Sequence, residues 1–259
     1  HELRTPLTLI LGPTERLLAA PNLREEQRRD LALVTRNARM LLRQVNDLLD
    51  VSRLEAGRLE PRWCKTDLAK LVQMTASHFE GLARERDTRF TTGGPESVPA
   101  ELDPDLIQRV LLNLVSNAFK FTPESGQIRI SLRATSDARG VIEVADSGAG
   151  VKPEQRELIF ERFHQADGSA TRRFGGAGLG LAIAKDFVEL HGGTLDVADA
   201  PEGGAMFIVE LPLQAPEGVS VRDTPSERPS LPPPDASQLA LDELWSRAHS
   251  GDSLAPAPA

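Results

Sequence analysis

The chain has 259 residues, 40% of them hydrophobic, which suffices for one large or two modest soluble domains. Its 30 basic and 38 acidic side chains give a formal net charge of −8, which excludes a nucleic-acid backbone as the main partner. No apolar run reaches the roughly 18 residues of a membrane span, and Cys64, the one cysteine, excludes an intrachain disulfide and favours a reducing compartment. We therefore expect a cytoplasmic segment that contacts neither nucleic acid nor membrane. Because it starts on a histidine, we interpret it as part of a longer protein, and leave open a parent anchored in the inner membrane.

Three reactive side chains lie within the first helical turns. His1 and Thr5 are four residues apart and share a helix face, and Glu2 can reach the imidazole ring. This combination suits phosphoryl transfer. The alternative is a surface histidine beside a Thr-Pro step with no catalytic role.

Two amphipathic helices are predicted to open the chain. Their apolar residues alternate in steps of three and four, the spacing of a coiled-coil seam. The seam residues are Leu3, Leu7, Ile10, Thr14 and Leu17, then Leu31, Val34, Ala38, Leu41, Val45 and Leu48. The short connection at Pro21-Asn22 makes the helices antiparallel. Two helices bury little surface alone, so we predict a homodimer with a four-helix bundle; a hairpin packed on the rest of the chain is the alternative. His1 and Thr5 fall off the seam.

The helical pair ends near Gly57, and Pro61 prevents its continuation. This places a first domain at residues 1–60. The pattern that follows predicts helices at 67–79, 103–121 and 179–190, and strands at 89–91, 128–132, 141–144, 194–198 and 205–213. Helices with mostly antiparallel strands predict a two-layer α/β sandwich over residues 61–214, so the whole chain is α+β.

The last part of the chain is rich in Pro, Ser, Asp and Glu, including Pro232 to Pro234. This composition predicts a disordered linker or tail over residues 215–259. Residues 239–245 could form one short helix there, either as an isolated apolar segment or as a docking element.

The helix predicted at 103–121 carries Asn113, Asn117 and Lys120 on nearly one face. A carboxamide oxygen suits Mg²⁺, which keeps several waters and binds mainly through phosphates. The lysine would supply counter-charge for those phosphates. On their own, amides on a helix are more often surface residues than ligands.

Two glycine clusters follow. Asp146 ends a predicted strand, and Gly148 and Gly150 let the backbone approach a planar ligand. The carboxylate could accept a hydrogen bond from an exocyclic amine, which would distinguish adenine from guanine. The same turn could serve only to end the strand.

The second cluster, Gly176 to Gly180, opens a helix whose N–H groups can hold phosphate. It is not a P-loop, because no Gly-Lys-Ser/Thr follows. Leu181 stands where a dinucleotide fingerprint starting at Gly176 needs its last glycine. The polar loop before it, at about 164–174, contains Arg172 and is typical of a mobile lid whose arginines meet phosphate.

Together and in this order, the motifs resemble the catalytic core of a sensor histidine kinase. Residues 1–8 are similar to the H box, 113–122 to the N box, 146–150 to the G1 box, 160–163 to the F box and 176–180 to the G2 box. The resemblance covers residues 1 to about 213. It implies a dimerisation and phosphoacceptor hairpin, followed by an ATP-binding domain of the fold shared with gyrase, heat-shock chaperones and mismatch-repair ATPases.

The resemblance implies a protein histidine kinase that uses ATP and Mg²⁺. His1 would accept the γ-phosphoryl group, Glu2 would act as base, and Thr5 would help position water in a reverse, phosphatase activity. The phosphoryl group would pass to an aspartate of a response-regulator receiver domain, either separate or C-terminal in the same parent chain, as in a hybrid kinase.

The resemblance also implies the nucleotide-binding residues. They are Asn113, Asn117, Lys120, Phe121, Asp146, Gly148, Gly150, Arg172, Gly176, Gly178, Leu179 and Gly180, with Asn117 as the metal ligand. The chain departs from the family at Ala177, where a threonine is frequent. The helix turns that precede the phosphoacceptor in family members are also missing from this segment.

Two other functions fit parts of the pattern. An ATPase of the same fold uses a glutamate where this chain has Asn113, and an amide cannot act as the base for water. A catalytically inactive nucleotide-binding scaffold would signal through bundle geometry alone, and the presence of both Asn117 and Lys120 argues against it.

Overall fold

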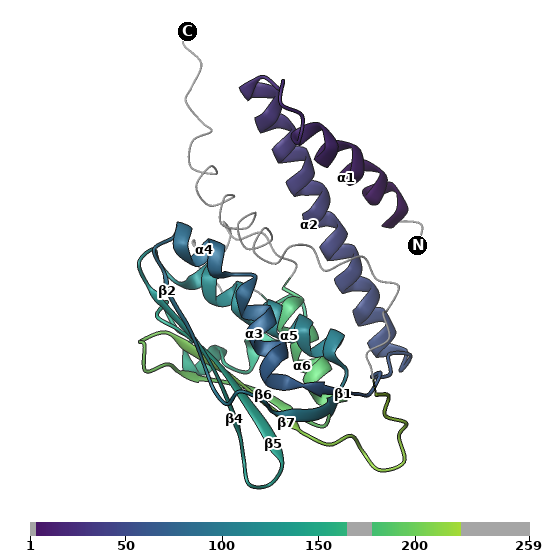
Figure 1. Ribbon diagram of the computed structural model, residues 1–259, viewed down its shortest axis with the longest axis vertical. Helices are drawn as coiled ribbons and strands as arrows, with labels where there is room; N and C mark the ends of the chain where they lie inside the picture. The colour runs from purple at the N-terminus through teal and green to yellow at the C-terminus, as the bar shows by residue number, and fades with distance from the viewer. Residues whose placement is uncertain (1–3, 165–177, 224–259) are drawn as a thin grey trace. The chain divides into compact units, whose positions relative to one another are not determined.

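A computed structural model describes residues 4–164 and 178–223 (Figure 1). The chain divides into two units, His1–Arg58 and Leu59–Ala259. No helix within the described ranges is both long enough and apolar enough to cross a membrane.

The first unit is a helical hairpin of α1 (Arg4–Leu18) and α2 (Glu25–Glu55). The Arg28 side chain of α2 donates to the carbonyls of Leu18 (3.0 Å) and Ala20 (3.4 Å), so it caps the end of α1. After α2, Gly57 adopts a φ of 61°, and the Arg58 N–H returns to the carbonyl of Arg53. The predicted helical pair and its glycine stop are confirmed.

Only half of the predicted seam closes the hairpin. The two helices contact each other, and Leu7 of α1 and Ala38 of α2 are the seam residues that are buried. A second apolar series stays between 44% and 52% exposed and repeats every seven residues on each helix. It comprises Ile10 and Leu17 on α1, and Val34, Leu41 and Leu48 on α2. A single chain therefore leaves a row of apolar side chains exposed on each helix.

The second unit contains a five-stranded sheet in the order β2-β4-β5-β7-β6. The strands are β2 (Arg89–Gly93), β4 (Gln127–Ala134), β5 (Arg139–Asp146), β6 (Thr194–Asp199) and β7 (Ala205–Pro212). All neighbours are antiparallel except β2 and β4, which are parallel. All five strands had been expected from the sequence, but not the parallel pairing of β2.

Helices cover one face of this sheet (Figure 1). They are α3 (Leu68–Ser77), α4 (Glu80–Glu85), α5 (Pro104–Phe121) and α6 (Gly180–Leu190). Buried side chains such as Ile130 of β4 and Leu114 of α5, both no more than 1% exposed, form the core between the layers. Residues alternate along a strand, so the opposite face carries Arg129, Ser131 and Glu143, with Met206 and Ile208 of β7 beside them. The predicted two-layer α/β sandwich is confirmed.

A second, two-stranded sheet pairs β1 (Cys64–Asp67) with β3 (Pro99–Leu102). The last described residues lie against it: the Lys65 N–H donates to the Arg222 carbonyl, and the Arg222 N–H donates to the Trp63 carbonyl. This packing carries the described chain past residue 214, where the linker had been expected to begin. Strands of four residues give no clear alternation, so the sequence analysis missed both. Two short 3₁₀ turns, η1 (Pro153–Gln155) and η2 (Leu158–Phe160), complete the unit.

Candidate functional site

The two asparagines of helix α5, Asn113 and Asn117, differ in their hydrogen bonding. The Asn113 Nδ2 donates to the Gly180 carbonyl at 3.1 Å, so it joins α5 to the first turn of α6. Asn117 lies one turn further along the same face and is half-buried. Its side chain forms no hydrogen bond within residues 4–164 and 178–223. Asn117 is therefore the amide that can still bind a ligand with both its oxygen and its nitrogen.

The end of α5 lies against the turn after β5. Lys120 places its Nζ 5.5 Å from the ring centroid of Phe121, whose side chain is 45% exposed. A Cβ atom at Gly148 would lie 2.6 Å from the Phe121 carbonyl oxygen. Glycine at 148 thus allows the turn and the helix end to come together.

Asp146 is buried and held by backbone groups from two segments. Its Oδ1 accepts hydrogen bonds from Gly148 N–H (2.7 Å) and Ala205 N–H (3.3 Å). Burial raises the pKa of this carboxyl group, while these two N–H groups act in the opposite direction and the charge of Glu202 adds to the increase. Oδ2 accepts no hydrogen bond from the part of the chain that the structure describes, so it can accept one from a ligand.

The turn between β6 and β7 completes the surroundings of Asp146. The Gly204 N–H donates to the Asp146 carbonyl at 3.0 Å. A Cβ atom at Gly204 would overlap Asp146 Oδ1 and Gly148 N, so only glycine fits. Between the strands predicted at 194–198 and 205–213, Pro201 to Gly204 reads only as a connecting turn, so this role does not follow from the sequence pattern. The adjacent glycines were the available signal.

The G2 segment is described from Gly178 onward. Gly178 has a φ of 67°, and its carbonyl accepts a hydrogen bond from the Phe163 N–H at 3.1 Å. Leu179, only 2% exposed, packs into the core, so it offers a ligand its backbone rather than its side chain. Gly150 also has positive φ, at 71°. Both glycines adopt backbone conformations that other residues rarely take.

The F box is attached to α6 and the sheet. Arg162 pairs with Asp186 of α6 at 3.1 Å, and the Phe160 ring meets the Phe207 ring edge-on at 6.4 Å between centroids. Phe163 is 64% exposed. The segment therefore holds one end of the loop that precedes Gly178.

Several predicted site residues lie outside the described residues. They are His1, Glu2, Arg172 and Gly176, together with the lid predicted at about 164–174, except for His164. Thr5 lies in the first turn of α1 with an exposed side chain, as expected for a position off the seam.

The donors in this site fit Mg²⁺ held mainly by phosphate. No group of three His, Cys, Asp or Glu side chains that could enclose a metal occurs among the described residues. Asn117 offers one uncommitted amide oxygen, and Mg²⁺ commonly takes only one or two protein ligands beside phosphates and water. One such amide oxygen, on the helix whose Asn113 contacts the start of α6, is compatible with that pattern.

Two families match the chain in sequence. Residues 1–57 match the His Kinase A (phospho-acceptor) domain, and residues 102–215 match the histidine kinase-, DNA gyrase B- and HSP90-like ATPase family. The order of the two matches is the order of the motifs along the chain.

The named relatives of the chain are also histidine kinases. The chain is 49% identical over 218 residues to the hybrid signal transduction histidine kinase D of Dictyostelium discoideum, covering 82% of this chain and 14% of that protein. It is 42% identical over 252 residues to the sensor histidine kinase TmoS of Ectopseudomonas mendocina, covering 96% of this chain and 26% of that protein. The chain thus spans about a quarter or less of the length of these two relatives.

A solved structure shows the same architecture. The crystal structure of full-length ShkA in complex with AMPPNP matches with a TM-score of 0.69 and 34% sequence identity, over 83% of this chain and 45% of that chain. AMPPNP is an ATP analogue, which agrees with the ATPase family of residues 102–215. The chain belongs to the histidine kinases and comprises a phosphoacceptor region followed by an ATP-binding catalytic region.

Proposed function

We propose that this chain transfers the γ-phosphoryl group of ATP to His1 and then to an aspartate on a response-regulator receiver domain. In the first step an imidazole nitrogen attacks the γ-phosphorus, an N–P bond forms, the bond to the β–γ bridging oxygen breaks and ADP leaves. In the second step an aspartate carboxylate oxygen attacks the same phosphorus, an O–P bond forms and the N–P bond breaks. The ring takes up a proton in place of the one it lost in the first step, which regenerates neutral histidine. The receiver is either a separate protein or part of the same parent chain.

The hydrogen bond from Asn113 to Gly180 carries the proposal. It joins α5, whose Asn117 is the proposed Mg²⁺ ligand, to the start of α6, whose backbone is the proposed phosphate site. The two bonded positions are 67 residues apart in the sequence. Around this joint, Asn117 would hold Mg²⁺, Lys120 would neutralise phosphate charge and the Gly178–Gly180 backbone would bind phosphate oxygens. Mg²⁺ would supply charge neutralisation on the β- and γ-phosphates.

Asp146 would recognise the base. Its Oδ1 accepts hydrogen bonds from two backbone N–H groups, so Oδ2 is the oxygen that would accept a hydrogen bond from the base. The exocyclic amine of adenine can donate to that oxygen, whereas the carbonyl of guanine or hypoxanthine at the same ring position cannot. Gly148 and Gly150 would allow the ring to approach the backbone.

The phosphoacceptor group follows from the H box. Glu2 would hold the His1 ring with a neutral nitrogen available for attack, since a protonated imidazolium has no lone pair to offer. Thr5, in the first turn of α1, would position water when the kinase dephosphorylates its partner. These roles rest on the family match of residues 1–57.

The exposed apolar series on α1 and α2 supports a homodimer. Its seven-residue spacing is the spacing with which helices pair in bundles. A second copy would cover Ile10 and Leu17 together with Val34, Leu41 and Leu48. We propose residues 1–60 as the dimerisation hairpin and extend the ATP-binding domain from the predicted 61–214 to 61–223, because Arg222 pairs with Trp63 and Lys65. The linker would then begin after residue 223 instead of at 215.

The Asn113 contact also weighs against an ATPase that hydrolyses ATP directly. That activity needs a carboxylate base at this position, and here an amide donates its N–H to a backbone carbonyl. An inactive scaffold would not need both Asn117 and Lys120 on one face. We therefore favour the kinase over both alternatives.

Incubation of the chain with γ-labelled ATP and Mg²⁺ tests the proposal. We expect an acid-labile, base-stable label on the protein, the stability typical of phosphohistidine, and no label on Asn117→Ala. Ser116→Ala, on the same helix, is the matched control and should label normally. Unchanged labelling of Asn117→Ala would remove the proposed metal ligand.

A further inference from the structure

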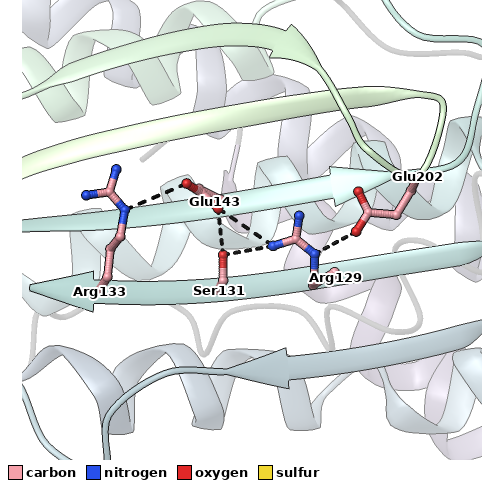
Figure 2. Close-up of polar contacts among 5 residues, drawn as sticks. All are labelled: Arg129, Ser131, Arg133, Glu143 and Glu202. Carbon is pink, nitrogen blue, oxygen red and sulfur yellow. Dashed lines mark hydrogen bonds and ion pairs between the residues drawn. The ribbon is translucent and has the colours of Figure 1, made fainter.

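A polar network lies on the sheet face that the helices leave open (Figure 2). It joins Arg129 and Ser131 of β4 to Glu143 of β5, and extends to Glu202 in the turn between β6 and β7. Its members come from three separate parts of the chain. None of them had been assigned a role from the sequence.

Arg129 lies at the centre of the network. Its Nε donates to Glu202 Oε1 at 2.6 Å, and its Nη1 donates to Ser131 Oγ at 3.1 Å. The Ser131 hydroxyl donates to Glu143 Oε2 at 2.9 Å, and the same carboxylate oxygen lies 3.6 Å from Arg129 Nη1. The guanidinium thus contacts β4 and β5 through Nη1, and it binds the β6–β7 turn through Nε (Figure 2).

The turn that Arg129 holds is the turn that orients Asp146. Glu202 precedes Gly204 and Ala205, whose N–H groups donate to the Asp146 carbonyl and to its Oδ1. The turn is closed by the Ala200 N–H, which donates to the Gly204 carbonyl at 2.9 Å. A displacement of Glu202 would therefore move the donors that set the direction of the Asp146 carboxylate.

The charges of Arg129 and Glu202 also connect Arg129 to Asp146. The carboxylate of Glu202 is only 13% exposed, and its Oε2 is buried without a hydrogen-bond partner in the described residues. Arg129 lowers the pKa of Glu202, and the charge of Glu202 acts to raise the pKa of Asp146. Without Arg129, a poorly solvated negative charge would remain close to Asp146, and the turn would reorient to hydrate it.

We propose that Arg129 is a positioning residue for base selectivity, which acts through Glu202 and the β6–β7 turn on Asp146. This proposal rests on the function proposed above, in which Asp146 recognises the adenine amine. It assigns Arg129 no contact with the nucleotide. Its effect should therefore appear in discrimination between bases rather than in phosphate binding.

The affinities of the chain for ADP and IDP, measured by titration calorimetry, test the proposal. The two ligands differ at the base only where adenine has its exocyclic amine and hypoxanthine a carbonyl. For Arg129→Ala we expect ADP to bind about tenfold more weakly, with IDP affinity nearly unchanged, because one lost charge-assisted contact is worth roughly this factor. Arg129→Lys keeps the charge without the planar fork, so it should recover part of the preference.

A double-variant comparison separates action through Glu202 from a general loss of stability. If Arg129 acts through Glu202, adding Arg129→Ala to Glu202→Gln should cause little further change in the ADP to IDP ratio. Arg133→Ala, which loses only a 3.8 Å contact with Glu143 on the same face, is the matched control and should retain the wild-type ratio.

The outcomes are distinct. An unchanged ADP to IDP ratio in Arg129→Ala, or a lowered melting temperature with an unchanged ratio, would overturn the positioning role while leaving the kinase proposal intact. Equal affinity of the wild-type chain for ADP and IDP would instead overturn the assignment of Asp146 as the adenine acceptor, and the proposal for Arg129 with it.

Discussion

The side chain of Asn113 donates a hydrogen bond of 3.1 Å to the carbonyl of Gly180, the first residue of α6. The two positions belong to motifs that sequence inspection treats separately. The bond makes them one structural unit, because it ties the start of α6, which we propose to bind phosphate, to the helix that carries Asn117. It also occupies the amide that, in an ATPase of this fold, would be replaced by the catalytic base.

Loss of this bond should weaken nucleotide binding. In Asn113→Ala the Gly180 carbonyl loses its donor and α6 loses its attachment to α5. We expect the affinity for ADP to fall about five- to tenfold, corresponding to a net contribution of about 1 kcal/mol for one hydrogen bond. Titration calorimetry gives the value, with Ser116→Ala as the control from the same helix. Wild-type affinity in Asn113→Ala would show that the joint is dispensable.

A methyl group at Gly204 should damage the base site. The new Cβ would overlap Asp146 Oδ1 and Gly148 N, so the turn must shift. For Gly204→Ala we expect a loss of about 1–3 kcal/mol in the free energy of unfolding, the usual range for overpacking, and a loss of ADP binding. Gly81→Ala is the matched control, because a Cβ there has no heavy atom within 4 Å and the residue lies in α4. Gly81→Ala should stabilise the protein slightly. If urea unfolding gave Gly204→Ala a higher free energy of unfolding than Gly81→Ala, the predicted clash would be contradicted.

The raised pKa of Asp146 predicts an unusual pH dependence of nucleotide binding. Burial is the main cause of the shift, and recognition of the amine needs the ionised carboxylate. ADP affinity should therefore decline on acidification at a higher pH than for an ordinary aspartate. In Asp146→Asn this dependence should disappear, together with most of the preference for ADP over IDP. A pH profile that is the same in both proteins would assign the titration to another group.

The same shift has a consequence for stability. The folded state holds the proton of Asp146 more tightly than the unfolded state, so folding is weakened as pH rises from the unfolded pKa through the folded pKa. Above that window the cost is constant. Without ligand, Asp146→Asn should therefore be at least as stable as the wild type at neutral pH, as measured by thermal unfolding. Strong destabilisation would show that the carboxylate is needed for folding rather than for binding.

A charge placed in the exposed apolar series should prevent dimerisation. Leu41 is 48% exposed in one chain and lies in the middle of the seven-residue series on α2. Leu41→Glu should give a monomer in analytical ultracentrifugation, because a buried, unpaired carboxylate is costly. Leu9→Glu is the control, since Leu9 is 69% exposed and lies off the series. Dimerisation of Leu41→Glu at wild-type strength would place the interface elsewhere.

Most of the fold could be predicted because its elements carry strong local signals. Both helices of the hairpin follow from apolar spacing and from Gly57. The helix predicted at 103–121 is present with Asp103 as its N-cap residue, whose Oδ1 accepts hydrogen bonds from the Asp105 and Leu106 N–H groups. The small sheet of β1 and β3 was missed because four-residue strands leave too short a pattern. The parallel partner of β2 was missed because pairing between distant strands depends on packing rather than on local pattern.

The site was predictable in its chain order but not in its connections. Asp146 and Asn117 could be singled out because their motifs are local. The support of Asp146 by Gly204 could not, since the two residues lie far apart in sequence and a Gly-Gly step before a strand reads as a simple turn. The pair of Arg129 and Glu202, 73 residues apart, leaves no periodic signal at all.

The phosphorylated residue itself is the most direct test of the proposed kinase activity. The chain would be incubated with ATP and Mg²⁺, digested at alkaline pH to preserve phosphohistidine, and the modified peptide sequenced by mass spectrometry, with His1→Gln treated in parallel. We predict a phosphoryl group on His1 of the wild-type chain and none on the variant. Release of free phosphate without any modified peptide, or a modified peptide of equal abundance from His1→Gln, would contradict the account.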